Sequence, residues 1–140
     1  MSKLADRIFD PAKSGVYRAS HDRDIRTALH GRTHDLAEVR LPRGKDAMLA
    51  EIAAALDFPD WFGANWDALE DCLTDLSWRP QGPHLFLFSD AVPGDELGIL
   101  QDVLASAAES WGERGRCFFA VFIDPGGSLS LPALYRQKAA

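Results

Sequence analysis

Residues 58–76 read FPDWFGANWDALEDCLTDL and contain the strongest local signal in the chain. Asn65 is a good helix N-cap, because its side-chain oxygen can accept a hydrogen bond from a free N–H group of the first turn. Asp67 lies in that turn, where the helix dipole favours a negative charge. Large apolar residues then recur at spacings of three and four, at Trp66, Leu69, Leu73 and Leu76. The spacing predicts a helix from Asn65 to about Ser77 that buries one face.

A second face of this helix is acidic. Asp67, Asp71 and Thr74 follow one another at i, i+4 and i+7, Glu70 lies beside them, and Asp75 adds one turn. From Ala47 to Ser77 the chain has seven acids and no Lys, Arg or His. Like charges at these spacings destabilise a helix by about 0.2–0.5 kcal/mol per pair, so the cost here is about 1 kcal/mol. We therefore expect the face to bind a basic partner, the alternative being an ordinary solvated acidic face.

Two aromatic residues, Trp61 and Phe62, precede the helix. They are too large and apolar for both to lie in a solvated loop, so at least one of them should enter the core. The other can remain exposed beside the carboxylates, where an aromatic side chain makes a good anchor for a protein partner.

The rest of the chain predicts alternating strands and helices. Unbroken apolar runs at 84–88 and 117–123 are typical of strands buried on both faces of a parallel sheet, and residues 35–41 form a third strand. Helical spacing extends from Met48 to Leu56, with Asp46 as the expected cap, and from Leu97 to about Gly112. A short strand at 15–19 and a short helix at 22–30 are weaker expectations. The sequence thus predicts a small α/β fold with right-handed crossovers.

Composition limits the possible functions. A chain of 140 residues with 46% apolar content fits one domain, and a net charge of −6 argues against general nucleic-acid or membrane-surface binding. The charge is uneven, because residues 1–45 carry ten Lys and Arg against six Asp and Glu. With no secretory signal, no membrane-spanning run and only two distant cysteines, we expect a cytoplasmic protein.

Little in the sequence indicates an enzyme. Cys72 and Cys117 are more typical of structural thiols than of nucleophiles, because no His or Lys is near either in sequence. His30 and His34 with Asp35, or Asp67 with Asp71, are weak candidates for a metal site, and the second pair is also a weak candidate for acid–base chemistry. No phosphate-binding loop, serine triad or zinc spacing is present. We therefore expect no catalytic residues, no metal and no cofactor.

The stretch FGANWDALEDCLT closely resembles the signature of the barstar family of intracellular ribonuclease inhibitors. Weaker agreement in element order extends from Asp35 to Ile123. The resemblance implies an α/β fold in which a small three-stranded parallel sheet packs against helices. Residues 35–124 would form the barstar-like domain, 1–34 an N-terminal extension and 125–140 a C-terminal tail.

The family function implies that this chain is an immunity protein. An acidic helix and its preceding loop would mimic RNA phosphates and block the active site of a small basic ribonuclease, barnase-like or a related nuclease toxin. The protein itself would contact neither nucleic acid nor membrane, and would be a monomer before complex formation.

The resemblance also assigns roles by position. Asp71 matches the central acid, Asp67 the acid one turn earlier and Thr74 the hydroxyl one turn later, while Trp61 matches an aromatic that lies against the catalytic His of the nuclease. Glu70 departs from the family pattern, because it replaces a Trp. A later acid matches Glu109, or alternatively Glu113. The residues expected to contact the ribonuclease are Trp61, Gly63, Asn65, Asp67, Glu70, Asp71, Thr74 and Glu109.

A different class of function stays open at this point. The same acidic helix would serve a non-inhibitory interaction module that docks on some other basic protein. Both kinds of protein would show salt-dependent binding, but only an inhibitor would have a nuclease as its partner.

Overall fold

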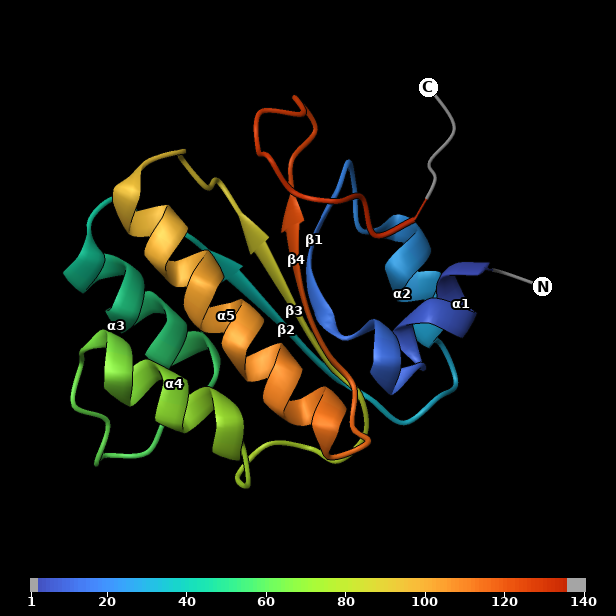
Figure 1. Cartoon of the computed structure of the whole chain (residues 1–140), viewed down its shortest axis with the longest axis horizontal. Coiled ribbons are helices and arrows are strands. Elements are labelled where there is room, and N and C mark those ends of the chain that lie inside the picture. Colours follow the sequence, from blue (N-terminus) through green and yellow to red (C-terminus); the bar gives the residue numbers. More distant parts are fainter. Residues whose placement is uncertain (1–2, 136–140) are drawn as a thin grey trace.

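A four-stranded parallel sheet lies between two layers of helices (Figure 1) in the computed structural model of this chain, which describes residues 3–135. The strand order is β1-β4-β3-β2, and the strands are β1 Gly15–Ala19, β2 Asp35–Arg40, β3 His84–Ser89 and β4 Phe118–Ile123. The parallel α/β prediction is confirmed, but the prediction of three strands is wrong. The reason is that β1 pairs with β4 from Gly15 opposite Phe119 to Ala19 opposite Ile123, and so extends the sheet.

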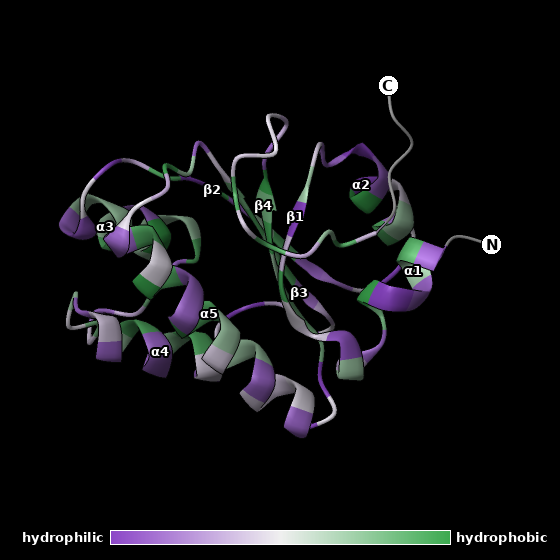
Figure 2. Cartoon of the chain, turned by 45° about the horizontal axis from the view of Figure 1, so that its top comes forward, coloured by the Kyte–Doolittle hydropathy of each residue, from purple (hydrophilic) through white to green (hydrophobic). Residues whose placement is uncertain are grey.

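The central strands are buried on both faces, as their apolar runs predict. Side chains alternate along a strand, so Phe86 and Phe88 of β3 pack into one core cluster whereas Leu85 and Leu87 pack into the other. All four are at most 3% exposed. In Figure 2, β4 is hydrophobic along its length, while α4 alternates between hydrophilic and hydrophobic residues.

The first helical layer consists of α3 Lys45–Ala55, α4 Trp66–Asp75 and α5 Asp95–Glu113. Their apolar stripes pack with Phe86 and Phe88 into the larger core cluster. The expectation that Asp46 caps α3 is wrong. Gly44 is the N-cap, with a positive φ of 95° that places Asp46 inside the first turn.

The second helical layer is built from the first thirty residues of the described chain. Helices α1 Lys3–Ile8 and α2 Arg23–Leu29 lie on the opposite side of the sheet from α5 (Figure 1), whereas the 3-10 turn η1 Pro11–Lys13 between them lies against the C-terminal part of α5. Ile8 and Ile25 are completely buried and belong to the cluster that contains Phe119 of β4. The expected short strand and short helix are therefore both present.

The segment after β4 returns to this layer. Arg18 of β1 donates from its backbone N–H to the Pro132 carbonyl, and Leu134 is fully buried in the second cluster. The expected tail covers residues 125–140, of which 136–140 lie outside the described residues, as do residues 1 and 2 of the expected extension. Among residues 3–135, no helix is both long and apolar enough to cross a membrane.

Candidate protein-binding surface

Helix α4 forms where the sequence predicts it. The Asn65 Oδ1 atom accepts a hydrogen bond of 2.8 Å from the Ala68 N–H, which confirms the predicted cap. Leu69, Leu73 and Leu76 are at most 2% exposed, and they turn one side of the helix into the core. Leu76 ends the helix in the left-handed conformation, with φ of 51°. The cap and the buried stripe fix which side of α4 faces solvent.

The solvent side of α4 carries the predicted acids. Asp67, Glu70, Asp71 and Asp75 are all exposed. Within the part of the chain that the structure describes, none of them takes part in an ion pair. Thr74 is half-buried, and its hydroxyl donates back to the Glu70 carbonyl at 2.9 Å, which leaves its oxygen as an acceptor. The face is therefore an anionic helical surface whose acids make no ion pair within the described residues.

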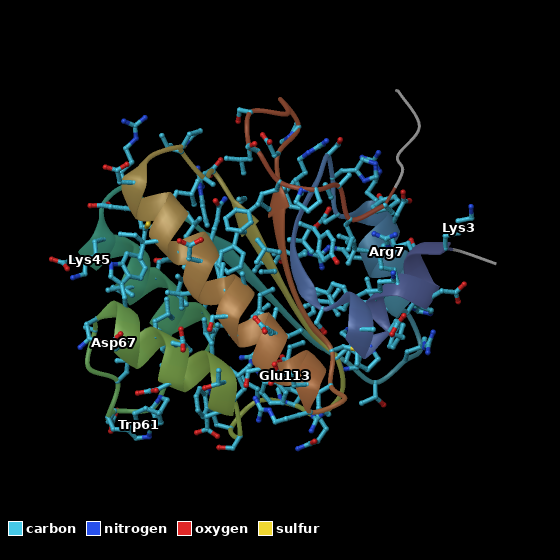
Figure 3. The ribbon with its side chains drawn as sticks, in the orientation of Figure 1. Lys3, Arg7, Lys45, Trp61, Asp67 and Glu113 are labelled. Atoms are coloured by element: carbon cyan, nitrogen blue, oxygen red, sulfur yellow. The ribbon has the colours of Figure 1, made fainter. Side chains whose placement is uncertain are left out.

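A shallow hollow lies at the start of this surface. Asn65, Trp66, Asp67 and Asp71 line it from α4, and Lys45, the first residue of α3, lines it from the neighbouring helix. Figure 3 shows Lys45 and Asp67 on the same side of the molecule. The sequence reasoning missed Lys45, because it lies just before the acid-only stretch and only the packing of α3 beside α4 brings it to the acids.

The two aromatic residues ahead of α4 have separate roles, as expected. Phe62 is half-buried against the core and meets Phe58 edge to face, with 4.9 Å between ring centroids. Trp61 is 59% exposed, and its ring makes a T-shaped contact with that of Trp78, with 6.3 Å between ring centroids. Trp61 is therefore the aromatic residue available to a partner, and Figure 3 shows it next to the start of α4.

Gly63 lies close to the side chains at the start of α4. A Cβ atom at this position would lie 3.3 Å from the Asn65 side-chain nitrogen and 3.5 Å from the Ala68 Cβ atom. A larger residue would thus crowd the side chain that caps the helix. The next residue, Ala64, has φ of 54°, so the chain turns sharply between Trp61 and the cap.

Glu109 is not brought together with the acids of α4. Glu109 and Glu113 both line a hollow between α5 and the segment of η1 and β1. The residue of α5 that meets α4 is instead Trp111, whose Nε1–H donates to the Leu73 carbonyl at 2.7 Å. Arg114, the C-cap that follows α5, donates to the Thr74 carbonyl at 2.8 Å. Figure 3 shows Glu113 at the C-terminal end of α5, well away from Asp67.

A partly buried network of charged side chains joins the connection between α4 and β3 to the first residues of β2 and β3. Arg79, in the connection from α4 to β3, bonds Asp35 through Nη2 at 2.7 Å and Asp57 through Nη1 at 3.1 Å. His84 Nδ1 lies 2.7 Å from the same Asp35 carboxylate, which is 1% exposed. Burial alone would raise the pKa of Asp35, but the hydrogen bonds from His84 and Arg79 outweigh it and hold the pKa below its usual range. Sequence reasoning missed this network because its members are far apart in the chain.

The other candidate chemistry does not assemble into a site. Cys72 and Cys117 are buried free thiols, and burial raises the pKa of each to about 11, so neither is a ready nucleophile. Within residues 3–135, no group of three or more His, Cys, Asp or Glu side chains is arranged to hold a metal ion. The sequence suggested a metal site of His30, His34 and Asp35, but Asp35 bonds instead to Arg79 and His84.

These features define a parallel α/β protein with an acidic helical surface and an adjacent exposed tryptophan. The family model for Barstar (barnase inhibitor) matches residues 33–123, which is more than half of the 140-residue chain, and the chain belongs to this family. A search of the curated proteins found no match. The family match begins just before β2, so α1, η1, β1 and α2 all precede it.

Proposed function

We propose that this protein inhibits a small basic ribonuclease by inserting α4 and the Trp61 loop, residues 56–65, into the nuclease active site. The observation that carries the proposal is the set of exposed α4 acids, none of which has an ion-pair partner within the described residues. Membership of the barstar family supports a role of this type.

The geometry explains how such a surface would imitate RNA. Asp67 and Asp71 lie one turn apart on a fixed helix, so two carboxylates are presented to the Arg, Lys and His side chains that otherwise hold RNA phosphates. Because these acids make no ion pair within residues 3–135, binding would replace the water around them with cationic groups directly. Trp61 adds a rigid apolar contact beside the charges.

Long-range attraction would accelerate the encounter. An acidic face that meets a basic cleft raises the association rate, and added salt screens this effect. Glu70 extends the anionic face where the family pattern has an apolar residue. We infer that Glu70 makes the protein prefer a target nuclease that has an additional cationic side chain facing Glu70 at the edge of its active site.

The test is inhibition of a barnase-like ribonuclease by the purified chain and by the double variant Asp67→Asn/Asp71→Asn. The double variant should inhibit at least about a hundredfold more weakly, since each position is expected to act as an interface hot spot. The matched control, Asp6→Asn/Asp102→Asn, loses the same two charges at exposed positions on α1 and α5. Equal inhibition by the parent and the double variant would refute the proposal.

A further inference from the structure

Arg79 connects the candidate binding loop to the core of the protein. Its side chain is 11% exposed and bridges two carboxylates, one buried and one at the surface. We propose that Arg79 is a positioning residue that fixes the Trp61 loop in its binding conformation before a partner arrives. This inference rests on the proposed function, and it adds a residue from outside the acidic surface to that function.

One side of the guanidinium is anchored. Nη2 and Nε of Arg79 donate to the two oxygens of Asp35 at 2.7 and 3.2 Å, which is the paired geometry that a guanidinium makes with a carboxylate. Asp35 is the first residue of β2, and His84, its other partner, is the first residue of β3. Arg79 is thus fixed to the ends of two neighbouring strands.

The other side of the guanidinium reaches the loop. Nη1 of Arg79 lies 3.1 Å from Asp57 Oδ2, at the point where the chain leaves α3 with a positive φ of 54°. The Asp57 side chain is 78% exposed. An exposed ion pair is ordinarily weak, in part because two flexible side chains must be ordered. Here the bonds to Asp35 already order the Arg79 side chain. The ion pair with Asp57 therefore mainly orders Asp57 and the loop that follows it.

Trp78, the neighbour of Arg79, holds the same loop through different contacts. Its Nε1–H donates to the Leu56 carbonyl at 2.8 Å, and its ring makes T-shaped contacts with Phe58 and Trp61, with 5.9 and 6.3 Å between ring centroids. Trp78 and Arg79, three and four positions after the last residue of α4, therefore hold the loop that precedes α4. Trp61, exposed on one side, rests on this support.

A loop held in this way loses less conformational freedom when a partner binds. Arginine is needed because a lysine ammonium is a single point charge and cannot form a paired bond with Asp35 while also reaching Asp57. Replacement by lysine should therefore keep a cation beside the buried carboxylate but release the loop.

The first experiment measures hydrogen exchange in the free protein, without any nuclease. In the parent, the loop amides of Phe58 and Phe62 donate to the carbonyls of Ala53 and Pro59. These two amides should exchange faster in Arg79→Lys and in Asp57→Asn, while the exchange rates of the β3 and β4 amides should not change. Asn tolerates the positive φ at position 57. Asp60→Asn, which removes the same charge from the same loop but breaks no ion pair of the described residues, is the control.

Asp57→Asn leaves the Asp35 bonds in place, so it decides the question if Arg79→Lys does not fold. Loop exchange at the parent's rate in a folded Asp57→Asn protein would overturn the inference. Exchange that is equally fast in Asp60→Asn would also overturn it, because loss of charge alone would then explain the effect.

The second experiment is a double-mutant cycle on ribonuclease binding. Arg79→Lys should weaken binding by roughly threefold to tenfold, the loss expected from freeing an ordered side chain and its loop. In a Trp61→Ala background the same substitution should have no effect, because Arg79 acts through the position of Trp61. A loss of equal size in both backgrounds would contradict the inference. Failure of the parent to bind would refute the proposed function, and the exchange result would still decide the role of Arg79.

Discussion

At the scale of single residues, the seven acids from Ala47 to Ser77 are not equivalent. Asp57 is paired with Arg79, a residue two positions beyond the acid-only stretch. Asp67 and Asp71 line the hollow that also contains Lys45. The absence of basic residues in the sequence stretch therefore overstates the charge imbalance most at Asp57, which is paired, and less on α4, where Lys45 lies near the acids but forms no ion pair with them. Position in the fold decides which acids are available to a partner.

Asp35 makes stability depend on pH in acid. Its pKa is lower in the folded chain than the usual value of about 3.9, so its contribution to stability is present above about pH 4 and is lost as pH falls through the folded-state pKa. Asp35→Asn should lower the free energy of unfolding by on the order of 3–5 kcal/mol at pH 7, because Arg79 loses its buried counter-charge and one of its two acceptor oxygens becomes an NH₂ group. Urea unfolding at a series of pH values should show the difference from the parent shrinking below about pH 4. A difference that stays constant down to pH 3 would contradict this account.

At the scale of elements, α4 is divided between the core and the solvent. Leu69 and Leu73 are completely buried, while the acids between and beside them are exposed. This division was predictable, because helical periodicity separates the two faces without any knowledge of the rest of the fold. Periodicity could not show that Lys45 from α3 borders the acids, since that contact depends on how two helices pack.

The Asn65 cap gives a prediction for this element. Asn65→Ala should lower the free energy of unfolding by about 1 kcal/mol, because the Ala68 N–H loses its acceptor at the start of α4. Asn65→Asp should retain most of the stability, since a carboxylate can accept the same bond. Thermal unfolding of the three proteins provides the comparison. Equal stability of Asn65→Ala and the parent would show that α4 does not depend on its cap.

At the scale of the whole molecule, the second helical layer completes the fold. The barstar match covers residues 33–123, yet Leu85 and Leu87 of β3 are buried by helices that come before that range. The apolar runs of β3 and β4 predicted strands covered on both faces. The sequence could not reveal what covers the second face, because α1 and α2 are short and β1 has only five residues.

This layer should contribute to stability as much as the first one does. Ile25→Ala should lower the free energy of unfolding by about 2–5 kcal/mol, the usual cost of emptying a fully buried aliphatic site. Leu73→Ala, in α4, is the matched comparison from the first layer and should cost a similar amount. Chemical denaturation should give a single transition for both variants. Two transitions, or a loss well under 1 kcal/mol for Ile25→Ala, would mean that α2 folds as a separate unit.

The predictable parts of the site were those encoded locally. The order of the apolar and acidic positions in α4, its cap, and the need for one of Trp61 and Phe62 to be buried all follow from short-range spacing. Which of the two aromatics is exposed was not predictable, because it depends on the contacts of Phe62 with Phe58. Arg79 was also beyond local reasoning, since its two partners lie 22 and 44 positions away in the chain.

The pairing of β1 with β4 also bears on how the chain folds during its synthesis. Gly15 lies opposite Phe119, so the ribosome produces one edge of the sheet about a hundred residues before the strand that it must join. At usual elongation rates that interval lasts roughly 5–20 s. During this time β1 lacks the strand with which it pairs, and α4 is translated before β4. The acidic helix is therefore made before the last strand of the sheet on which its helical layer packs.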